Sequence, residues 1–137
     1  GVPAGPLRET ASGGELSRVM LAIMGVAAGT AGAAERTLVF DEVDAGIGGQ
    51  TARAVGDALR ELSAGRQVIC ITHLPQIASL AARHFSIAKD ASTTPARTTV
   101  TELRDGEVVS ELARMLGADG DGDGAARRHA EELLRAA

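Results

Sequence analysis

Two acidic residues and a histidine each follow a short apolar run in this chain. Asp41 and Glu42 end the stretch TLVFDE, and His73 comes directly after QVICIT. Adjacent carboxylates can divide two tasks in phosphate chemistry. One can hold Mg²⁺, which prefers a few carboxylates together with phosphates and water, and the other can orient or deprotonate an attacking water. The alternative interpretations are a solvated loop start for the acids and a structural role for the histidine.

A second candidate site lies in the stretch ASGGELSR, residues 11–18. Ser12 and Glu15 have the spacing of a capping box, in which each side chain bonds the other residue's backbone amide at a helix start. That pattern does not explain Gly13 and Gly14, because glycine costs up to about 1 kcal/mol against alanine in helical geometry. Bare amides at a helix N-terminus bind anions. The stretch therefore predicts a phosphate-binding surface supported by a capping box.

The elements that would position the acids and the histidine form a strand–helix–strand unit. Buried strands, apolar on both faces, are predicted at residues 37–40 and 67–72, with a helix at 50–64 between them. Parallel strands joined in this way end at the same edge of a sheet, where the ligands of open α/β sheets bind. We therefore expect Asp41, Glu42 and His73 to share one edge.

Helices and a pair of strands are expected around this unit. A helix from Glu15 is predicted by an apolar stripe, and the interrupted apolar stretch 19–34 is interpreted as a buried helix because it is too short to span a membrane. The stripe consists of Leu16, Met20, Ile23 and Ala27. The second half of the chain predicts antiparallel strands near the sheet edge at 84–89 and 97–103, and helices at 76–82, 108–116 and 125–137.

Two segments are predicted to be irregular. Residues 1–11 contain two prolines and form an irregular lead-in, whereas residues 118–124 form a flexible acidic loop. That loop begins like an EF-hand calcium loop, but the position that should hold its bidentate glutamate is Ala130. We therefore expect no calcium site there.

Composition excludes several classes of function. The chain has 137 residues, enough for one domain with an aliphatic core, and only 1% of them are aromatic, which argues against a surface that stacks single-stranded bases. Its formal net charge of -4 gives no basic footprint for nucleic acid. The single cysteine, Cys70, excludes an internal disulfide and is expected to be a small core residue. We expect a soluble cytoplasmic chain with no membrane partner, cut from something larger.

The chain also lacks the usual means of holding a nucleotide. A Walker A loop reads G-x-x-x-x-G-K-[ST], but the only lysine here, Lys89, lies in a predicted strand and is followed by Asp90. The acids, the histidine and the helix end would therefore have to act on a nucleotide that another polypeptide segment holds.

Three motifs, in this order, resemble the C-terminal half of an ABC-type ATPase head. ASGGELSR resembles the signature motif, TLVFDEVDAGIGG the Walker B strand with its D-loop, and ITHLPQIA the switch-histidine loop. The resemblance covers residues 11–117 and is closer to SMC-like heads, in particular those of bacterial DNA repair ATPases. It implies an α/β fold for residues 1–137: the C-terminal lobe of a P-loop NTPase head, with a parallel sheet core, helices on both faces and antiparallel edge strands.

The resemblance also assigns roles to individual residues. Asp41 would coordinate Mg²⁺, Glu42 would be the general base for the attacking water, and His73 would contact the γ-phosphate and sense its loss. The signature residues would bind the γ-phosphate of ATP held by the other subunit, and the D-loop would communicate between the two sites. The signature residues are Ser12, Gly13, Gly14 and Glu15, and the D-loop residues are Asp44, Gly46 and Gly48.

One D-loop position departs from the usual pattern, because Gly48 stands where most SMC and transporter heads have aspartate. The implied partners are an N-terminal half that carries Walker A, a second head, and DNA contacted through the full-length protein. The implied function is ATP-driven head dimerisation in double-strand-break repair and recombination, near the nucleoid, with this chain inactive alone. The alternatives are a half-head of another SMC-like or ABC ATPase, and a non-catalytic interaction module of the same fold.

Overall fold

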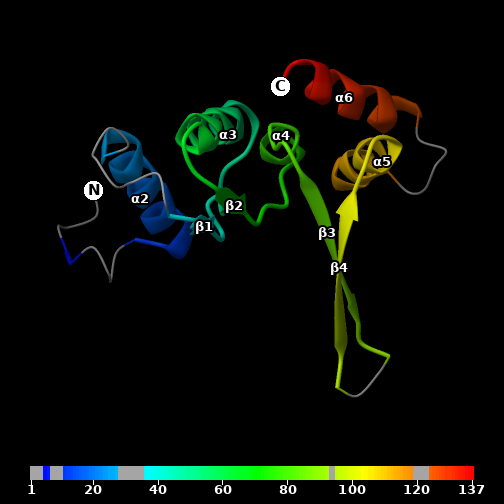
Figure 1. The fold of residues 1–137 in the computed structure, drawn as a ribbon, viewed down its shortest axis with the longest axis horizontal. Coiled ribbons are helices and arrows are strands. Elements are labelled where there is room, and N and C mark those ends of the chain that lie inside the picture. Colours follow the sequence, from blue (N-terminus) through cyan, green and yellow to red (C-terminus); the bar gives the residue numbers. More distant parts are fainter. Residues whose placement is uncertain (1–4, 7–10, 28–35, 93–94, 119–123) are drawn as a thin grey trace. The chain divides into compact units, whose positions relative to one another are not determined.

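A computed structural model describes residues 5–6, 11–27, 36–92, 95–118 and 124–137 of the chain. They divide into two compact units, Gly1–Ile77 and Ala78–Ala137. The first unit contains α2 (Gly13–Ala27), β1 (Leu38–Phe40), α3 (Gly49–Ser63), β2 (Val68–Cys70) and the start of α4 (Pro75–Ala78) (Figure 1). The second contains β3 (His84–Asp90), β4 (Arg97–Leu103), α5 (Gly106–Met115) and α6 (Gly124–Arg135).

The first unit confirms the predicted strand–helix–strand arrangement. β1 and β2 pair in parallel, with Phe40 opposite Cys70 at their carboxyl ends, and α3 connects them. Both strands are shorter than predicted, and α3 begins and ends one residue before the predicted range 50–64. The connectivity was predictable because two short runs of apolar, β-forming residues flank a segment with helical spacing.

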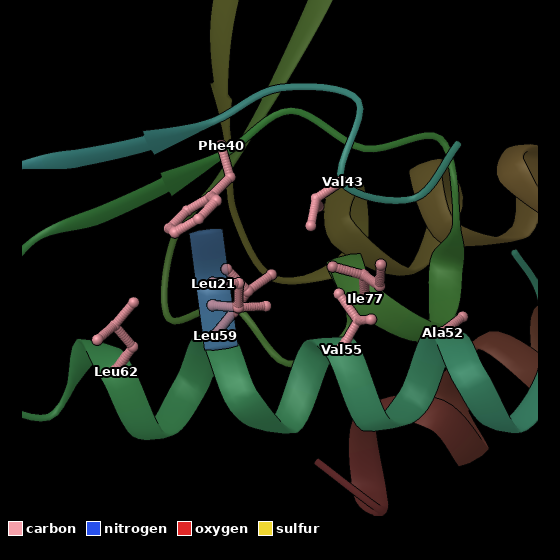
Figure 2. Close-up of a cluster of buried hydrophobic side chains, with 8 residues drawn as sticks. All are labelled: Leu21, Phe40, Val43, Ala52, Val55, Leu59, Leu62 and Ile77. Carbon is pink, nitrogen blue, oxygen red and sulfur yellow. The ribbon is translucent and has the colours of Figure 1, made fainter. Parts of the chain in front are cut away.

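The core of this unit is built on one face of α3. Its buried residues follow one another at intervals of three and four positions, which places them on a single helix face. Figure 2 shows Leu59 below Phe40 and beside Leu21 of α2, whereas Val55 and Ala52 lie nearer Ile77 and Val43. The α3 residues are Ala52, Val55, Leu59 and Leu62. This core is aliphatic apart from Phe40, as the composition predicted.

The sequence predicted the wrong buried face for α2. The helix begins at Gly13 rather than Glu15, and it buries Gly14 and Leu21, whereas Ile23 is 56% exposed. Of the other members of the predicted stripe, Leu16 and Met20 are 37% and 48% exposed, and only Ala27 is part-buried. The rotation follows from close packing at Gly14, because the residue seven positions later, Leu21, lies on the same helix face. The prediction of a buried helix is therefore also wrong over 19–27, and residues 28–35 lie outside the described part.

The prediction that both strand faces are buried is also wrong for the described residues. Phe40 is 5% exposed, but the intervening Val39 is 63% exposed and Ile69 of β2 is 45% exposed. Successive strand residues point to opposite faces, so α2 and α3 cover one face of β1 and β2 and the described residues leave the other uncovered.

The second unit confirms the antiparallel pair and both helices. β3 and β4 pair from His84 opposite Leu103 to Asp90 opposite Arg97, and form a two-stranded sheet of their own among the described residues, not the edge of the parallel sheet. α5 and α6 pack through Leu112, Ala113 and Ala130. α4 ends at Ala78, well before the predicted 82.

Several predictions fall on residues that the structure does not describe. Most of the predicted lead-in and residues 119–123 of the predicted acidic loop lie outside the described part. α5 begins at Gly106, two residues before the predicted start at 108, and α6 begins at Gly124 and ends at Arg135. No helix within the described ranges is long and apolar enough to cross a membrane.

Candidate functional site

The carboxyl ends of β1 and β2 bring the predicted acids and histidine to one sheet edge. The Ile71 amide donates to the Phe40 carbonyl oxygen at 2.9 Å, which continues the parallel pairing to the point where both strands end. Asp41 and Glu42 are exposed there, and neither carboxylate has a hydrogen-bond or ion-pair partner among the described residues. His73 is exposed as well, with 71% of its side chain accessible.

Asp44 connects the two strand ends. It is only 2% exposed, and its Oδ2 accepts hydrogen bonds from the Thr72 hydroxyl at 2.6 Å and the His73 backbone amide at 2.8 Å. The same oxygen lies 2.9 Å from Nδ1 of the His73 ring. Burial by itself would raise the pKa of Asp44, but the hydrogen bonds from Thr72 and His73 outweigh it, and the pKa is lowered.

The start of α2 confirms the predicted capping box. The Ser12 amide and hydroxyl donate to Glu15 Oε2 at 2.8 and 2.9 Å, and the Glu15 amide donates to the Ser12 hydroxyl oxygen at 3.3 Å. The hydrogen bonds from the Ser12 backbone and side chain lower the pKa of Glu15. The amides of Gly13 and Gly14 have no acceptor among the described residues.

The two glycines also have a packing role that the sequence did not reveal. A Cβ on Gly14 would lie 2.8 Å from the Glu42 carbonyl oxygen and 2.8 Å from the Ala45 Cβ, so only glycine allows the helix and the loop to approach this closely. A Cβ on Gly13 would lie 3.2 Å from Glu42 Oε2. The start of α2 therefore lies directly against the loop that carries the predicted base.

Two side chains of α2 that the sequence analysis did not consider hold this loop in place. Arg18 Nη1 donates to the carbonyl oxygens of Val43 at 3.2 Å and Ala45 at 2.9 Å. The Ser17 hydroxyl donates to the Asp41 carbonyl oxygen at 3.2 Å. Their only sequence signal is position: Arg18 follows Gly14 by four residues and so lies on the same helix face.

The loop after β1 has an unusual backbone. Glu42 has a φ of 57°, in the left-handed region, and its carbonyl oxygen accepts the Ala45 amide at 3.0 Å to close a turn. A side chain in that region costs about 1–2 kcal/mol, and such residues cluster at functional sites. Gly46 has a φ of 72°, which accounts for glycine there, whereas Gly48 is extended and precedes α3 as its N-cap. The D-loop roles of Asp44, Gly46 and Gly48 stay predictions.

The remaining chemistry near this edge is limited. Among the described residues, no group of three or more His, Cys, Asp and Glu side chains could hold a metal ion. Burial, and then the nearby carboxylates of Asp44 and Asp41, raise the pKa of Cys70 to about 11, as expected for an unreactive core thiol. A hollow of about 760 Å³ lies in the second unit beside α5, between Leu103 and Arg127, and none of the predicted site residues lines it.

Known proteins similar to this chain are DNA repair proteins. The chain is 47% identical over 136 residues to DNA repair protein RecN of Treponema pallidum, 47% identical over 137 residues to RecN of Streptomyces coelicolor, and 42% identical over 137 residues to RecN of Bacillus subtilis. These matches cover 99%, 100% and 100% of the chain, but only 23% of each relative's length. No protein-family model matches the chain.

A solved structure supports the predicted fold. It comes from work on ATP-driven dimerization and DNA-stimulated activation of SMC ATPases, and it superimposes with a TM-score of 0.57 at 17% sequence identity. The match covers 86% of this chain and 71% of that one. The predicted α/β fold of the SMC type is therefore confirmed, and the chain is similar over its whole length to a segment of the DNA repair protein RecN.

Proposed function

We propose that this chain is the C-terminal half of an SMC-like ATPase head in a RecN-type DNA double-strand-break repair and recombination protein. The observation that carries the proposal is the meeting of Asp41, Glu42 and His73 at one edge of a parallel sheet, next to the N-terminus of α2. The similarity to RecN proteins over the whole chain supports it. The chain has no Walker A loop, so a second segment must bind the nucleotide.

Each residue at this edge suits a separate task. Glu42 is exposed and would accept the proton of the attacking water, and His73 would contact the γ-phosphate through its accessible ring. Asp41 would hold Mg²⁺, for which one or two carboxylates, completed by phosphates and water, are the usual protein ligands. Its exposed carboxylate has no partner in the described part of the chain, so it is available to a cation. Mg²⁺, when bound, neutralises charge on the phosphates.

The signature stretch would act on the nucleotide of a second head. The amides of Gly13 and Gly14 have no acceptor among the described residues, and the capping box of Ser12 and Glu15 fixes the helix end that presents them. Helix N-termini with bare amides favour phosphate. ATP would then bind the closed pair of heads better than the open heads and shift the population towards closure.

The other partners and the location follow from the same assignment. The chain would complete its head with a Walker A half of its own protein, pair with a second head and contact DNA only through the complete protein. Its net charge of -4 argues against this segment as the main DNA grip. Such a protein would work in the cytoplasm at the nucleoid.

Replacing Glu42 with glutamine tests the proposal. In the complete protein, Glu42→Gln should lower kcat for ATP by at least about 100-fold, the size typical of a lost general base, and should accumulate an ATP-bound dimer. The matched control is Glu61→Gln, an exposed acid on α3, which should leave turnover unchanged. Steady-state phosphate release and size-exclusion chromatography with ATP measure the two effects. Normal turnover by Glu42→Gln would show that Glu42 is not the base.

A further inference from the structure

The buried carboxylate of Asp44 has a contact that the proposed mechanism does not use. Its Oδ2 lies 2.9 Å from Nδ1 of His73 and also accepts the Thr72 hydroxyl and the His73 backbone amide. Two hydrogen bonds and this close ring contact therefore converge on one oxygen. An ionised carboxylate only accepts hydrogen bonds, so the contact favours a hydrogen on Nδ1.

This contact determines how the imidazole ring is presented. A neutral imidazole carries hydrogen on one nitrogen only, and the partner of one nitrogen decides the state of the other. Nε2 has no partner in the described part of the chain, and 71% of the side chain is accessible. With the hydrogen on Nδ1, Nε2 is left accessible to a partner outside the described residues.

The hydroxyl of Thr72 extends the same arrangement to the backbone. It donates to Asp44 and accepts the Leu74 amide at 3.0 Å, so one carboxylate orders both the histidine ring and the two residues that flank the histidine. Asp44 itself belongs to the loop after β1 that carries Glu42. The ring of His73 is therefore tied to the same loop as the proposed base.

We propose that Asp44 is a positioning residue for His73: its carboxylate lies against Nδ1 and fixes the ring, and it leaves Nε2, once protonated from solvent, to donate a hydrogen bond to a phosphate oxygen. The identity of that phosphate rests on the proposed function, whereas the contact between Asp44 and the ring does not. Asp44 acts through His73 and touches no substrate itself.

The tautomer of His73 tests the contact directly. In the complete protein with ¹⁵N-labelled histidine, a long-range ¹H–¹⁵N spectrum at about pH 8.5, above the ordinary imidazole pKa, should show the Nδ1–H form. A His73→Ala sample assigns the signal. Asp44→Asn should move it towards Nε2–H, because the amide NH₂ can donate where the carboxylate accepted. An Nε2–H signal in the unmodified protein overturns the inference.

Turnover of ATP by a double-variant cycle tests the positioning role. Asp44→Asn should lower kcat by about 10- to 100-fold, the loss typical when a partner that orients a functional histidine is removed. In a His73→Ala background, Asp44→Asn should cause little further loss, because Asp44 acts through that ring. The matched control is Asp57→Asn on α3, which pairs with Arg53 and Arg60 and should not change turnover.

Failure of the inference and failure of the proposed function give different results. Equal further loss in the His73→Ala background would mean a structural role for Asp44 and overturns the positioning role alone. Full turnover of ATP by His73→Ala would overturn the role of His73 in the proposed function. The contact between Asp44 and the ring would then have no part in turnover, even where the spectrum shows Nδ1–H.

Discussion

Replacing Gly14 with alanine tests whether close backbone contact holds the start of α2 against the loop after β1. The added Cβ would lie 2.8 Å from the Ala45 Cβ, 2.8 Å from the Glu42 carbonyl oxygen and 3.1 Å from the Ala45 carbonyl oxygen. None of these atoms can move aside through a change of rotamer, since all three are backbone atoms or a Cβ fixed to the backbone. The helix and the loop must separate instead.

Two opposing effects set the size of the change. Alanine is favoured over glycine by at most about 1 kcal/mol in a helix. Inserting a methyl group into a tight contact costs about 1–3 kcal/mol. We therefore expect Gly14→Ala to lower the free energy of unfolding by up to about 2 kcal/mol. Gly25 in the same helix is the matched control, because nothing lies within 4 Å of its added Cβ, and Gly25→Ala should be stabilising by about 0.5–1 kcal/mol.

Urea unfolding followed by circular dichroism measures both free energies. Amide hydrogen exchange at residues 42–45 reports whether the loop has moved, and should rise in Gly14→Ala only. Opposite signs for the two variants support the close contact. If Gly14→Ala stabilises the protein as much as Gly25→Ala does, the contact is not the reason for glycine at this position.

Two further predictions concern the surroundings of the site. Arg18→Met keeps most of the apolar length of the side chain but leaves two carbonyl oxygens unpaired, and should lower the unfolding free energy by about 1–3 kcal/mol. Arg60→Met is the control. An equal loss of unfolding free energy in both variants would show that the hydrogen bonds of Arg18 to the loop do not stabilise the protein. Cys70 should be alkylated slowly at neutral pH, with a rate that rises up to about pH 11. Between about pH 9 and pH 11 the Cys70 thiol keeps its proton in the folded protein but loses it in the unfolded chain, so the free energy of unfolding should fall as pH rises above about 9. Half-maximal alkylation of the folded protein near pH 9 would exclude the raised pKa.

The connectivity of the first unit was predictable, but the burial of its elements was not. Short runs of β-forming apolar residues identify β1 and β2, and helical spacing identifies α3. Which face of α2 turns inward depends on the contact of Gly14 with a loop some thirty residues later, and no periodicity within the helix encodes that contact. The apolar stripe at Leu16, Met20 and Ile23 therefore predicted the wrong face.

The candidate site was likewise predictable in part. The placement of Asp41, Glu42 and His73 at one edge followed from strand direction, which sequence patterns predict well. The link through Asp44 could not be predicted, because the hydrogen bonds to Thr72 and His73 depend on the course of a turn with a left-handed residue. An aspartate in a loop sequence is normally expected to be solvated, and only the structure reveals that this one is buried.

The packing role of the glycines leaves their proposed phosphate contact intact. The Cβ of a helical residue projects sideways from the axis, whereas the first amides of a helix point along the axis beyond its N-terminus. Gly14 lacks a side chain where the loop approaches, yet its amide, like that of Gly13, has no acceptor among the described residues. The same close approach brings Glu42 Oε2 near Gly13, so the proposed base and the proposed phosphate contact lie next to each other. A change in the position of α2 would therefore move both together, and under the proposed function this would couple the nucleotide of a second head to the base of this one.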